Sequence, residues 1–417
     1  MNWSTLYICY YNITEPLVRT QVVAYLAELA KRGLEVHLLT FERERLADER
    51  RREIYLEMKN LGIEWSFLRY HQRPSLPATL YDIAAGTWRA FRLCRKRGIE
   101  VIHARSHVPA AMALALQKLT GARFLFDLRG LMAEEYADAG HWNSDSLKFR
   151  LTKRMESVFF HRADAMVMLT HRIKQELLAT HPGLSGRDSD ITVIPCCVQT
   201  DRFHIRPEER NAYRKLRNWE GRRVLTYVGK LGTWYLTAEM ARFFAAARRL
   251  DDRFFFQVLT QSDQELIRRE LEKAGVSRTD YDIRYAPPDE LPLILSSSDV
   301  GISFIRPCYS KLASSPTKVG EYLAAGLPVV ANVGIGDCDE MLTSGRVGVA
   351  VRDFSEEEFN RAASELVNLL EEDQTPTRCR DYAEREMSMR RVGGPLYAGV
   401  YAGLLKTDAG VAESAAV

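Results

Sequence analysis

Short apolar segments alternate with helical stretches along this chain of 417 residues, and this order constrains the fold more than any other feature. A strand, a helix and a second strand at this spacing form a βαβ unit, which requires a parallel sheet. Strands are predicted at residues 6–11, 36–40, 101–103, 123–127 and 165–169, and again at residues 224–229, 254–259, 283–285, 300–304 and 327–333. The sequence therefore predicts an α/β protein with two doubly wound, Rossmann-like parallel-sheet domains that face a central cleft.

A stretch without apolar periodicity separates the two series of strands. Residues 199–220 are polar and charged, as expected of a linker between domains. We therefore expect an N-terminal domain at residues 1–198 and a C-terminal domain at residues 199–385. An apolar pattern within residues 386–406 predicts a C-terminal helix, and the small and polar residues 407–417 are expected to form a disordered tail.

Composition and charge exclude several classes of protein. Apolar residues make up 46% and charged residues 27% of the chain, as in a soluble globular enzyme rather than a disordered or fibrous protein. A net charge of +3 is too small to indicate nucleic acid as a partner. No apolar run approaches the roughly 20 residues of a membrane span, and the run at residues 6–11 is too short for a secretory signal. Seven cysteines without regular spacing favour the reducing cytoplasm.

The segment at residues 314–331 has the most specific chemistry. It predicts a helix with Ser315 as the N-cap and Pro316 at the first helical position, followed by a buried strand. The free N–H groups and the positive dipole end of such a helix bind anions, and Lys318 adds a full charge there. Glu321 lies on the same helix face as Lys318. A phosphate at the amides with a sugar hydroxyl at the carboxylate describes a nucleotide, and the alternative is an ordinary solvated surface pair.

Polar loops follow two predicted strands of the N-terminal half, at the edge where open α/β sheets bind ligands. One loop contains His107, and the other contains Arg129, with Glu135 close behind it. These side chains are site candidates, whereas His103, within a strand, is expected in the core. The loop at residues 12–17 lacks the Gly-x-Gly-x-x-Gly pattern, which argues against a nicotinamide enzyme.

Several segments resemble GT-B glycosyltransferases of family 4. Pro316-Thr317-Lys318 together with residues 321–331 is similar to the donor-site segment of that family. Gly229-Lys230-Leu231-Gly232 is similar to the family's Gly-Arg-Leu, whose cation meets the donor diphosphate. Residues 127–130, with residues 41–42 and 70–74, resemble a bacterial polysaccharide-type branch of the family.

The resemblance implies a GT-B fold with an N-terminal acceptor domain, a C-terminal donor domain and a last helix that crosses back to the N-terminal domain. It implies a retaining transfer of a sugar from a nucleotide diphosphate-sugar donor to a glycan, lipid-linked or small-molecule acceptor. The expected donor-binding residues are Gly229, Lys230, Ser315, Thr317, Lys318, Val319 and Glu321. The expected catalytic residues are Arg129, His107 and Glu135, with Arg129 holding a phosphate or an acidic acceptor or pairing with Glu135. No His/Cys cluster with ligand spacing stands out, and neither a metal nor a cofactor is expected.

Two positions depart from the family pattern. Ala313 stands where the family usually has a glutamate that contacts the donor sugar, and Arg129 stands where many members have a histidine. These departures leave two alternatives open. One is a GT-B nucleotide-sugar epimerase, and the other is a degenerate GT-B chain that acts as a binding or scaffold subunit.

Two predicted helices are rich in basic residues, at residues 88–97 and 147–162. Such a helix lies on an anionic membrane surface or presents a solvated face to water, and both readings remain open. We therefore expect a cytoplasmic protein, with peripheral contact at the inner face of the membrane as one alternative.

Overall fold

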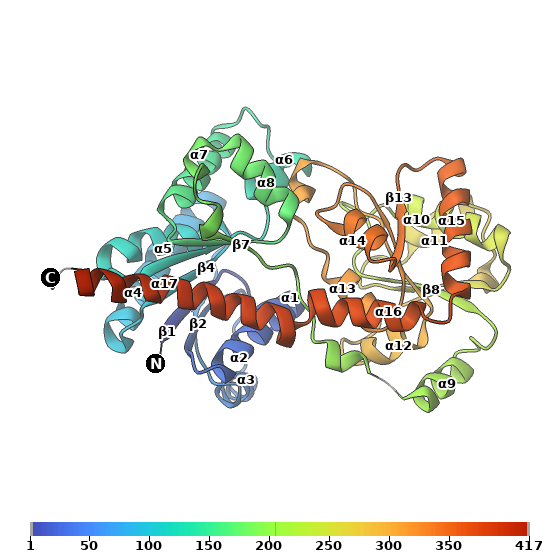
Figure 1. The fold of residues 1–417 in the computed structure, drawn as a ribbon, viewed down its shortest axis with the longest axis horizontal. Helices are drawn as coiled ribbons and strands as arrows, with labels where there is room; N and C mark the ends of the chain where they lie inside the picture. The colour runs from blue at the N-terminus through green and yellow to red at the C-terminus, as the bar shows by residue number, and fades with distance from the viewer. Residues whose placement is uncertain (1–2, 205, 415–417) are drawn as a thin grey trace. The chain divides into compact units, whose positions relative to one another are not determined.

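The computed structural model describes residues 3–204 and 206–414 of the chain, which divides into two compact units (Figure 1). Unit 1 comprises Met1–Pro195 with Val392–Val417, and unit 2 comprises Cys196–Arg391. The first boundary therefore lies three residues before the predicted position 198, and the second unit extends beyond the predicted position 385. The last segment of the chain groups with unit 1, where the family resemblance places the final helix.

Unit 1 contains a seven-stranded parallel sheet in the order β3-β2-β1-β4-β5-β6-β7. Its strands are β1 (Ser4–Cys9), β2 (Glu35–Glu42), β3 (Ile63–Arg69), β4 (Val101–Arg105), β5 (Arg123–Asp127), β6 (Ala165–Met168) and β7 (Ile191–Val193). The order reverses between β1 and β4, so the carboxyl ends of these strands frame the edge at which such sheets bind ligands. The edge strand β3 is absent from the sequence prediction, because it mixes polar, charged and aromatic residues instead of forming an apolar run.

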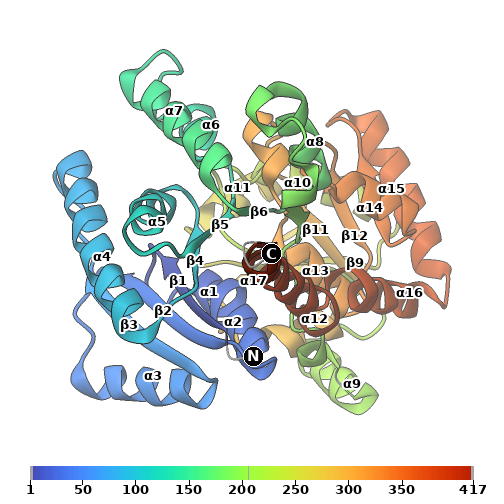
Figure 2. The same cartoon turned by 60° about the vertical axis from the view of Figure 1, so that its left-hand side comes forward.

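Helices cover both faces of this sheet (Figures 1 and 2). One face packs against α2 (Ala24–Lys31) and α3 (Asp48–Asn60), and the other against α4 (Ser75–Arg97), α5 (His107–Thr120) and α7 (Leu147–Arg162). The remaining helical segments are α1 (Pro16–Val18), η1 (Arg19–Val23), α6 (Met132–Asp138), α8 (His171–Thr180), η2 (Pro182–Leu184), η3 (Asp188–Asp190) and α17 (Gly394–Ser414).

The C-terminal helix α17 packs against α2 within unit 1. It continues to Ser414, where the sequence predicts a disordered tail from residue 407. Extending an existing helix adds one backbone hydrogen bond for each residue and needs no new nucleus, which favours this continuation. Residues 415–417 of the predicted tail lie outside the described residues. Within the described part of the chain, no helix combines the length and apolarity needed to cross a bilayer.

Unit 2 contains a six-stranded parallel sheet in the order β10-β9-β8-β11-β12-β13. Its strands are β8 (Arg223–Val228), β9 (Phe254–Leu259), β10 (Tyr281–Arg284), β11 (Val300–Ser303), β12 (Val329–Asn332) and β13 (Gly348–Val351). The helical segments are η4 (Thr200–Phe203), α9 (Pro207–Leu216), α10 (Thr237–Leu250), α11 (Glu265–Lys273), η5 (Arg278–Asp280), α12 (Leu291–Ser297), η6 (Tyr309–Ala313), α13 (Thr317–Ala324), α14 (Cys338–Ser344), α15 (Glu356–Glu371), α16 (Thr375–Tyr382), η7 (Ala383–Met387) and η8 (Met389–Gly393). The order reverses between β8 and β11, and the candidate donor segments follow these strands in sequence.

Residues 199–220, predicted as a linker, instead contain η4 and α9 and belong to unit 2. Helix α9 buries none of its residues, which is why the sequence shows no apolar periodicity there. Polar contacts hold the helix instead. Arg214 donates to the carbonyl oxygens of Ser297, Trp219 and Arg222 at 2.6–2.9 Å and pairs with Asp299 at 2.9 Å.

We predict that Asp299→Ala lowers the free energy of unfolding by about 1–3 kcal/mol. The carboxylate accepts hydrogen bonds from Arg210 at 2.8 Å, from Arg214 at 2.9 Å and from the Val224 N–H at 2.8 Å, and all of these donors lose their acceptor. Urea denaturation measures the change. Asp252→Ala, at an exposed position, is the matched control, and an equal effect in both variants would refute this anchoring role.

Candidate functional site

Helix α13 begins one residue later than predicted. Pro316, in an extended conformation, is the N-cap, and Thr317 is the first helical residue. The Ser315 hydroxyl accepts a hydrogen bond from the Cys196 N–H at 3.1 Å, and the Val319 N–H donates to the Pro316 carbonyl at 3.0 Å. The first N–H groups of an α-helix have no acceptor within the helix, and at this start they belong to Thr317 and Lys318.

The Lys318 ammonium lies in an aromatic and glycine-walled pocket. Its Nζ is 4.4 Å from the ring centroid of Tyr227 and 4.0 Å from that of Tyr235. A Cβ atom at Gly229 would lie 2.8 Å from Nζ, so only a glycine leaves room for the ammonium; Gly229 also has φ 142°. Within residues 3–204 and 206–414, this buried Nζ has no hydrogen-bond partner. An ammonium has three donors, so the site lacks the acceptors that a buried cation requires.

Burial also changes the ionisation of the two charged groups on this helix. Burial lowers the pKa of Lys318 to about 7, against the opposing attraction of Glu321. Burial raises the pKa of Glu321 to about 7, although Arg202 and Lys318 favour its charged form. In the described part of the chain, the Glu321 carboxylate makes no hydrogen bond or ion pair. Both groups are therefore desolvated without a hydrogen-bond partner, as expected of a site that is completed by a ligand.

Two further cations, from the segment that follows β11, lie over Trp234 on the loop that follows β8. The Lys311 Nζ lies 3.9 Å, and the Arg306 Cζ 4.9 Å, from the Trp234 ring centroid. The Lys230 side chain on the same loop is exposed, and its carbonyl accepts from the Tyr227 hydroxyl. Sequence reasoning missed Lys311 and Arg306. The one available signal was the Trp234-Tyr235 pair, because aromatic faces attract cations.

In unit 1, a buried carboxylate orients Arg129 at the carboxyl end of β5. The Oδ2 atom of Asp127 accepts from Arg129 Nε at 3.0 Å, from the Tyr397 hydroxyl at 3.2 Å and from the Tyr7 hydroxyl at 3.4 Å. Burial alone would raise the pKa of Asp127, but Arg129, His103 and Arg105 lower it below its ordinary value. Asp127 is therefore ionised, and the guanidinium of Arg129 is held by an internal ion pair.

The other predicted catalytic residues have different surroundings. His107 is buried, with Nε2 2.8 Å from Glu156 Oε2 and Nδ1 3.4 Å from the Ser106 hydroxyl. Glu156 also pairs with Lys153, so His107 is part of a buried ion-pair network. Both ring nitrogens therefore have partners within the protein, and the catalytic role of His107 stays a prediction. The Glu135 carboxylate lies against Gly130, where a Cβ atom would be 3.0 Å from Oε1.

The described residues include one group with the composition of a metal site, formed by Glu35, His37 and Glu64. His37 Nε2 is 3.0 Å from Glu35, its Nδ1 is 3.4 Å from Glu64, and Arg97 pairs with Glu64 at 2.6 Å. The group was missed because β2 and β3 bring it together only in the sheet. It lies near the amino ends of these strands, at the edge opposite to that of Arg129, and Arg97 already neutralises one of its carboxylates.

We predict that Lys318→Met stabilises the ligand-free protein by about 1–2 kcal/mol at pH 7. The pKa of this lysine falls from 10.5 in the unfolded chain to about 7 in the folded protein, so the unfolded chain binds the proton more tightly. The buried charge therefore destabilises the fold below pH 10.5, and this destabilisation reaches its full size below pH 7. Chemical denaturation at pH 7 checks the gain. Lys230→Met, the same change at an exposed position, should alter stability by less than about 0.5 kcal/mol. A loss of stability in Lys318→Met would contradict this account.

Two family models match most of the chain. Residues 18–202 match Glycosyltransferase Family 4, and residues 222–369 match Glycosyl transferases group 1. No curated protein matches the chain.

Solved structures share the fold over nearly the whole length. A glycosyltransferase from Rickettsia africae ESF-5 has 15% identity and a TM-score of 0.73, with 97% of this chain and 99% of that chain covered. Anabaena HepE, solved with UDP and glucose, has 12% identity and a TM-score of 0.70, with 96% and 100% covered. WaaG, a glycosyltransferase involved in lipopolysaccharide biosynthesis, has 16% identity and a TM-score of 0.62, with 94% and 98% covered. The predicted family and fold are thus confirmed: the chain is a GT-B glycosyltransferase, with a family 4 segment in its N-terminal half and a group 1 segment in its C-terminal half.

Proposed function

We propose that this glycosyltransferase is retaining and metal-independent, and that it transfers a sugar from a nucleotide diphosphate-sugar donor to a glycan, lipid-linked or small-molecule acceptor. The observation that most strongly supports a nucleotide diphosphate-sugar as the donor is the buried Lys318 ammonium, which has no hydrogen-bond partner in the described residues. UDP-sugars are the first donors to test, because HepE, which has a similar fold, was solved with UDP and glucose.

The donor diphosphate binds at the start of α13 in this proposal. Lys318 and the free amides of Thr317 and Lys318 supply the donors, and Gly229 leaves space beside the ammonium. Lys230 adds a cation from the loop after β8. A bound phosphate would give the Lys318 ammonium the acceptors that it lacks, and its negative charge would raise the lysine pKa.

The remaining donor-site residues either shape the start of α13 or bind the ribose. The side chain of Ser315 and the amide of Val319 fix the turn that precedes α13. Glu321 accepts hydrogen bonds from the ribose hydroxyls. As the carboxylate has no partner in the described residues, such hydroxyls would supply the donors that a buried carboxylate requires.

Leaving-group charge is the main chemical problem for this reaction. When the sugar–phosphate bond breaks, negative charge develops on the diphosphate, and the α13 dipole and Lys318 stabilise it without a metal. The leaving phosphate also accepts the acceptor hydroxyl proton, so that no dedicated general base is required.

In this proposal, the acceptor binds to unit 1. Arg129 remains the candidate for contact with a phosphate or an acidic acceptor, because Asp127 and Tyr397 fix its orientation at the ligand-binding edge of the sheet. Glu135 remains a candidate on the loop that follows.

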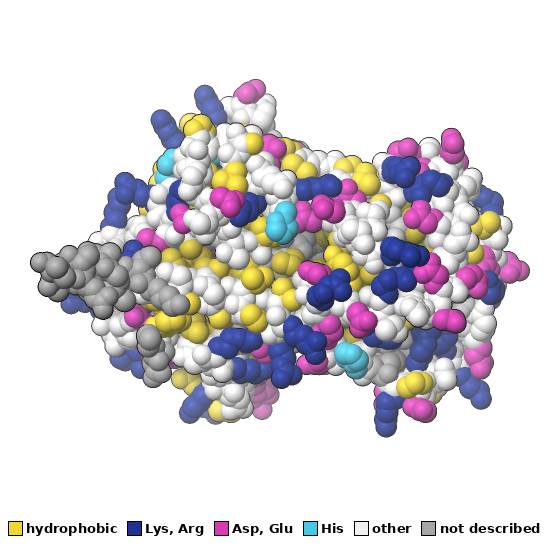
Figure 3. Space-filling model, viewed as in Figure 1, with side chains coloured by type: hydrophobic (Ala, Val, Ile, Leu, Met, Phe, Trp, Pro, Cys, Tyr) yellow, Lys and Arg dark blue, Asp and Glu magenta, His cyan; other side chains and the backbone are white. Residues whose placement is uncertain are grey.

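The cellular setting is part of the same proposal. The likeness to WaaG supports testing surface polysaccharide assembly in bacteria, with the protein in the cytoplasm and in peripheral contact with the anionic inner membrane. Figure 3 shows basic and acidic side chains interspersed over one face of the molecule. With a net charge of only +3, membrane contact would have to come from a local surface rather than from overall attraction.

We predict that one nucleoside diphosphate raises the melting temperature of the protein and that Glu321→Ala removes this shift. A thermal-shift screen with UDP, GDP, ADP, TDP and their sugars identifies the base. Glu272→Ala, an exposed change on α11, is the matched control and should retain the full shift. A shift that persists in Glu321→Ala would refute the site, and no shift with any nucleotide would favour a scaffold subunit. Epimerised donor without transfer would favour the epimerase alternative.

We also predict that prolonged treatment with EDTA leaves the transfer rate within about twofold of its starting value, since the helix dipole and Lys318 replace a Lewis acid. The rate is measured with the donor identified above. A large loss of activity that added Mg²⁺ or Mn²⁺ restores would contradict metal independence.

A further inference from the structure

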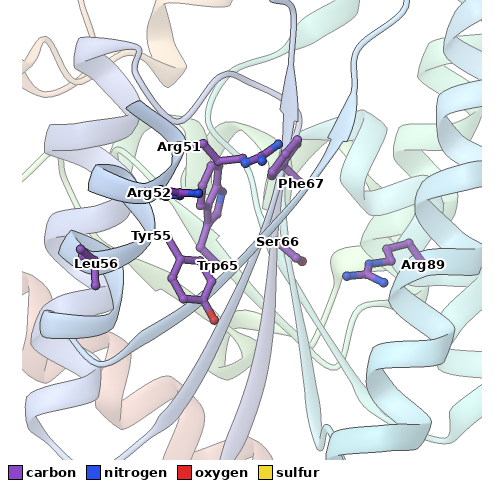
Figure 4. A pocket seen from close by; sticks show the side chains of 8 residues that line it. All are labelled: Arg51, Arg52, Tyr55, Leu56, Trp65, Ser66, Phe67 and Arg89. Carbon is purple, nitrogen blue, oxygen red and sulfur yellow. The ribbon is translucent and has the colours of Figure 1, made fainter. Parts of the chain in front are cut away.

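A groove of about 540 Å³ lies at the edge strand β3 of unit 1 (Figure 4). Helix α3 forms one side and α4 the other, and the strand runs between them. The lining residues are Arg51, Arg52, Tyr55, Leu56, Trp65, Ser66, Phe67 and Arg89. The volume is in the range of sites that bind small molecules.

Aromatic and aliphatic surface forms most of the groove. The rings of Trp65 and Phe67 stack with centroids 5.0 Å apart, and the Trp65 indole N–H is already satisfied by Thr40 at 2.9 Å. Tyr55 and Leu56 are 51% and 59% exposed beside them. Apolar groups that are left open to this extent indicate an apolar partner.

The rim of the groove is positively charged. Arg51 pairs with Asp48 at 2.8 Å, whereas Arg52 and Arg89 make no ion pair or hydrogen bond within the described residues. The lining includes no carboxylate. An occupant with one anionic group and an apolar body would complement both the rim and the floor.

The exposed face of α4 continues this surface. Leu80, Tyr81 and Trp88 are 57%, 61% and 62% exposed, and Arg92 and Arg95 follow on the same face. The acidic residue of α4 is Asp82, which is buried and accepts from Tyr10 at 2.6 Å. The helix therefore presents aromatic and basic groups to its surroundings without an opposing charge. Arginines also protect an edge strand from pairing, but that role does not explain the exposed aromatic side chains.

We propose that this groove holds the phosphate and upper acyl chain of an anionic phospholipid, and that the exposed face of α4 rests on the same membrane surface. The phosphate binds at the rim to which Arg52 and Arg89 give a positive charge, and Tyr55, Leu56 and Phe67 contact the chain. Trp88 and Tyr81 lie at the depth of the headgroups, where aromatic rings with a polar end are stable. The inference rests on the membrane contact of the proposed function and assigns it to one of the two basic helices, α4 rather than α7.

The test is sedimentation of the full-length protein with vesicles of phosphatidylglycerol and phosphatidylcholine, against vesicles of phosphatidylcholine alone. The groove variant is Arg52→Glu with Arg89→Glu. The matched control is Lys148→Glu with Arg150→Glu, which makes the same change of charge at exposed positions on α7. We expect binding to the anionic vesicles to weaken about tenfold or more in the groove variant and to remain near wild type in the control.

A second measurement places the aromatic face at the bilayer. Brominated acyl chains quench nearby tryptophan fluorescence, and we expect Trp88→Phe to remove part of this quenching, with the rest coming from Trp65 in the groove. Equal weakening in both charge variants, no binding of the wild-type protein to anionic vesicles, or preferred binding of a soluble acidic glycan would each overturn the proposal. Nucleotide stabilisation, measured on the same proteins, should be unchanged; its absence in wild type would refute the donor site without affecting the vesicle result.

Discussion

The donor site that we propose depends on one unfavourable interaction, the desolvation of the Lys318 ammonium. The fold places that ammonium against Tyr227, Tyr235 and Gly229, where the described residues offer it no acceptor. A protein interior stabilises such a group only when an anion or a lost proton compensates it. Helix α13 supplies the complementary feature, because its first amides are able to donate hydrogen bonds to an anion at the same place. In the proposed site, a bound anion would therefore relieve the unfavourable burial of this ammonium.

The polar side chains at the ligand-binding edge of unit 1 differ from Lys318, because they have partners within the protein. Asp127 accepts from Arg129 and Tyr397, and His107 lies within hydrogen-bond distance of Glu156. These groups are oriented before any substrate arrives, and the C-terminal helix α17 takes part through Tyr397. A positioned guanidinium at this edge suits recognition of an anionic acceptor better than proton transfer, because arginine stays protonated.

The sequence was sufficient for the fold class, for most strands and for the position of α13, because buried parallel strands and a capped helix have strong local patterns. It was insufficient where stability comes from polar or non-local contacts. Helix α9 is held by arginine contacts, and β3 mixes polar, charged and aromatic residues, so neither has an apolar signal. The aromatic rings beside Lys318 come from a separate strand and loop, and the group around Glu35 comes from two strands. Sequence spacing alone cannot bring such residues together. Only the structure also shows that both nitrogens of His107 are engaged.

The most direct measurement of the central claim is the proton balance of nucleotide binding at pH 8. At that pH the Lys318 amine is mostly neutral, and the nucleotide phosphates are fully ionised. Titration calorimetry in two buffers with different ionisation enthalpies gives the number of protons exchanged. If the diphosphate binds at Lys318, its charge raises the lysine pKa, and binding should take up most of one proton, with no uptake in Lys318→Met. Tight binding without proton uptake, or equal uptake in the variant, would show that the diphosphate does not bind at Lys318.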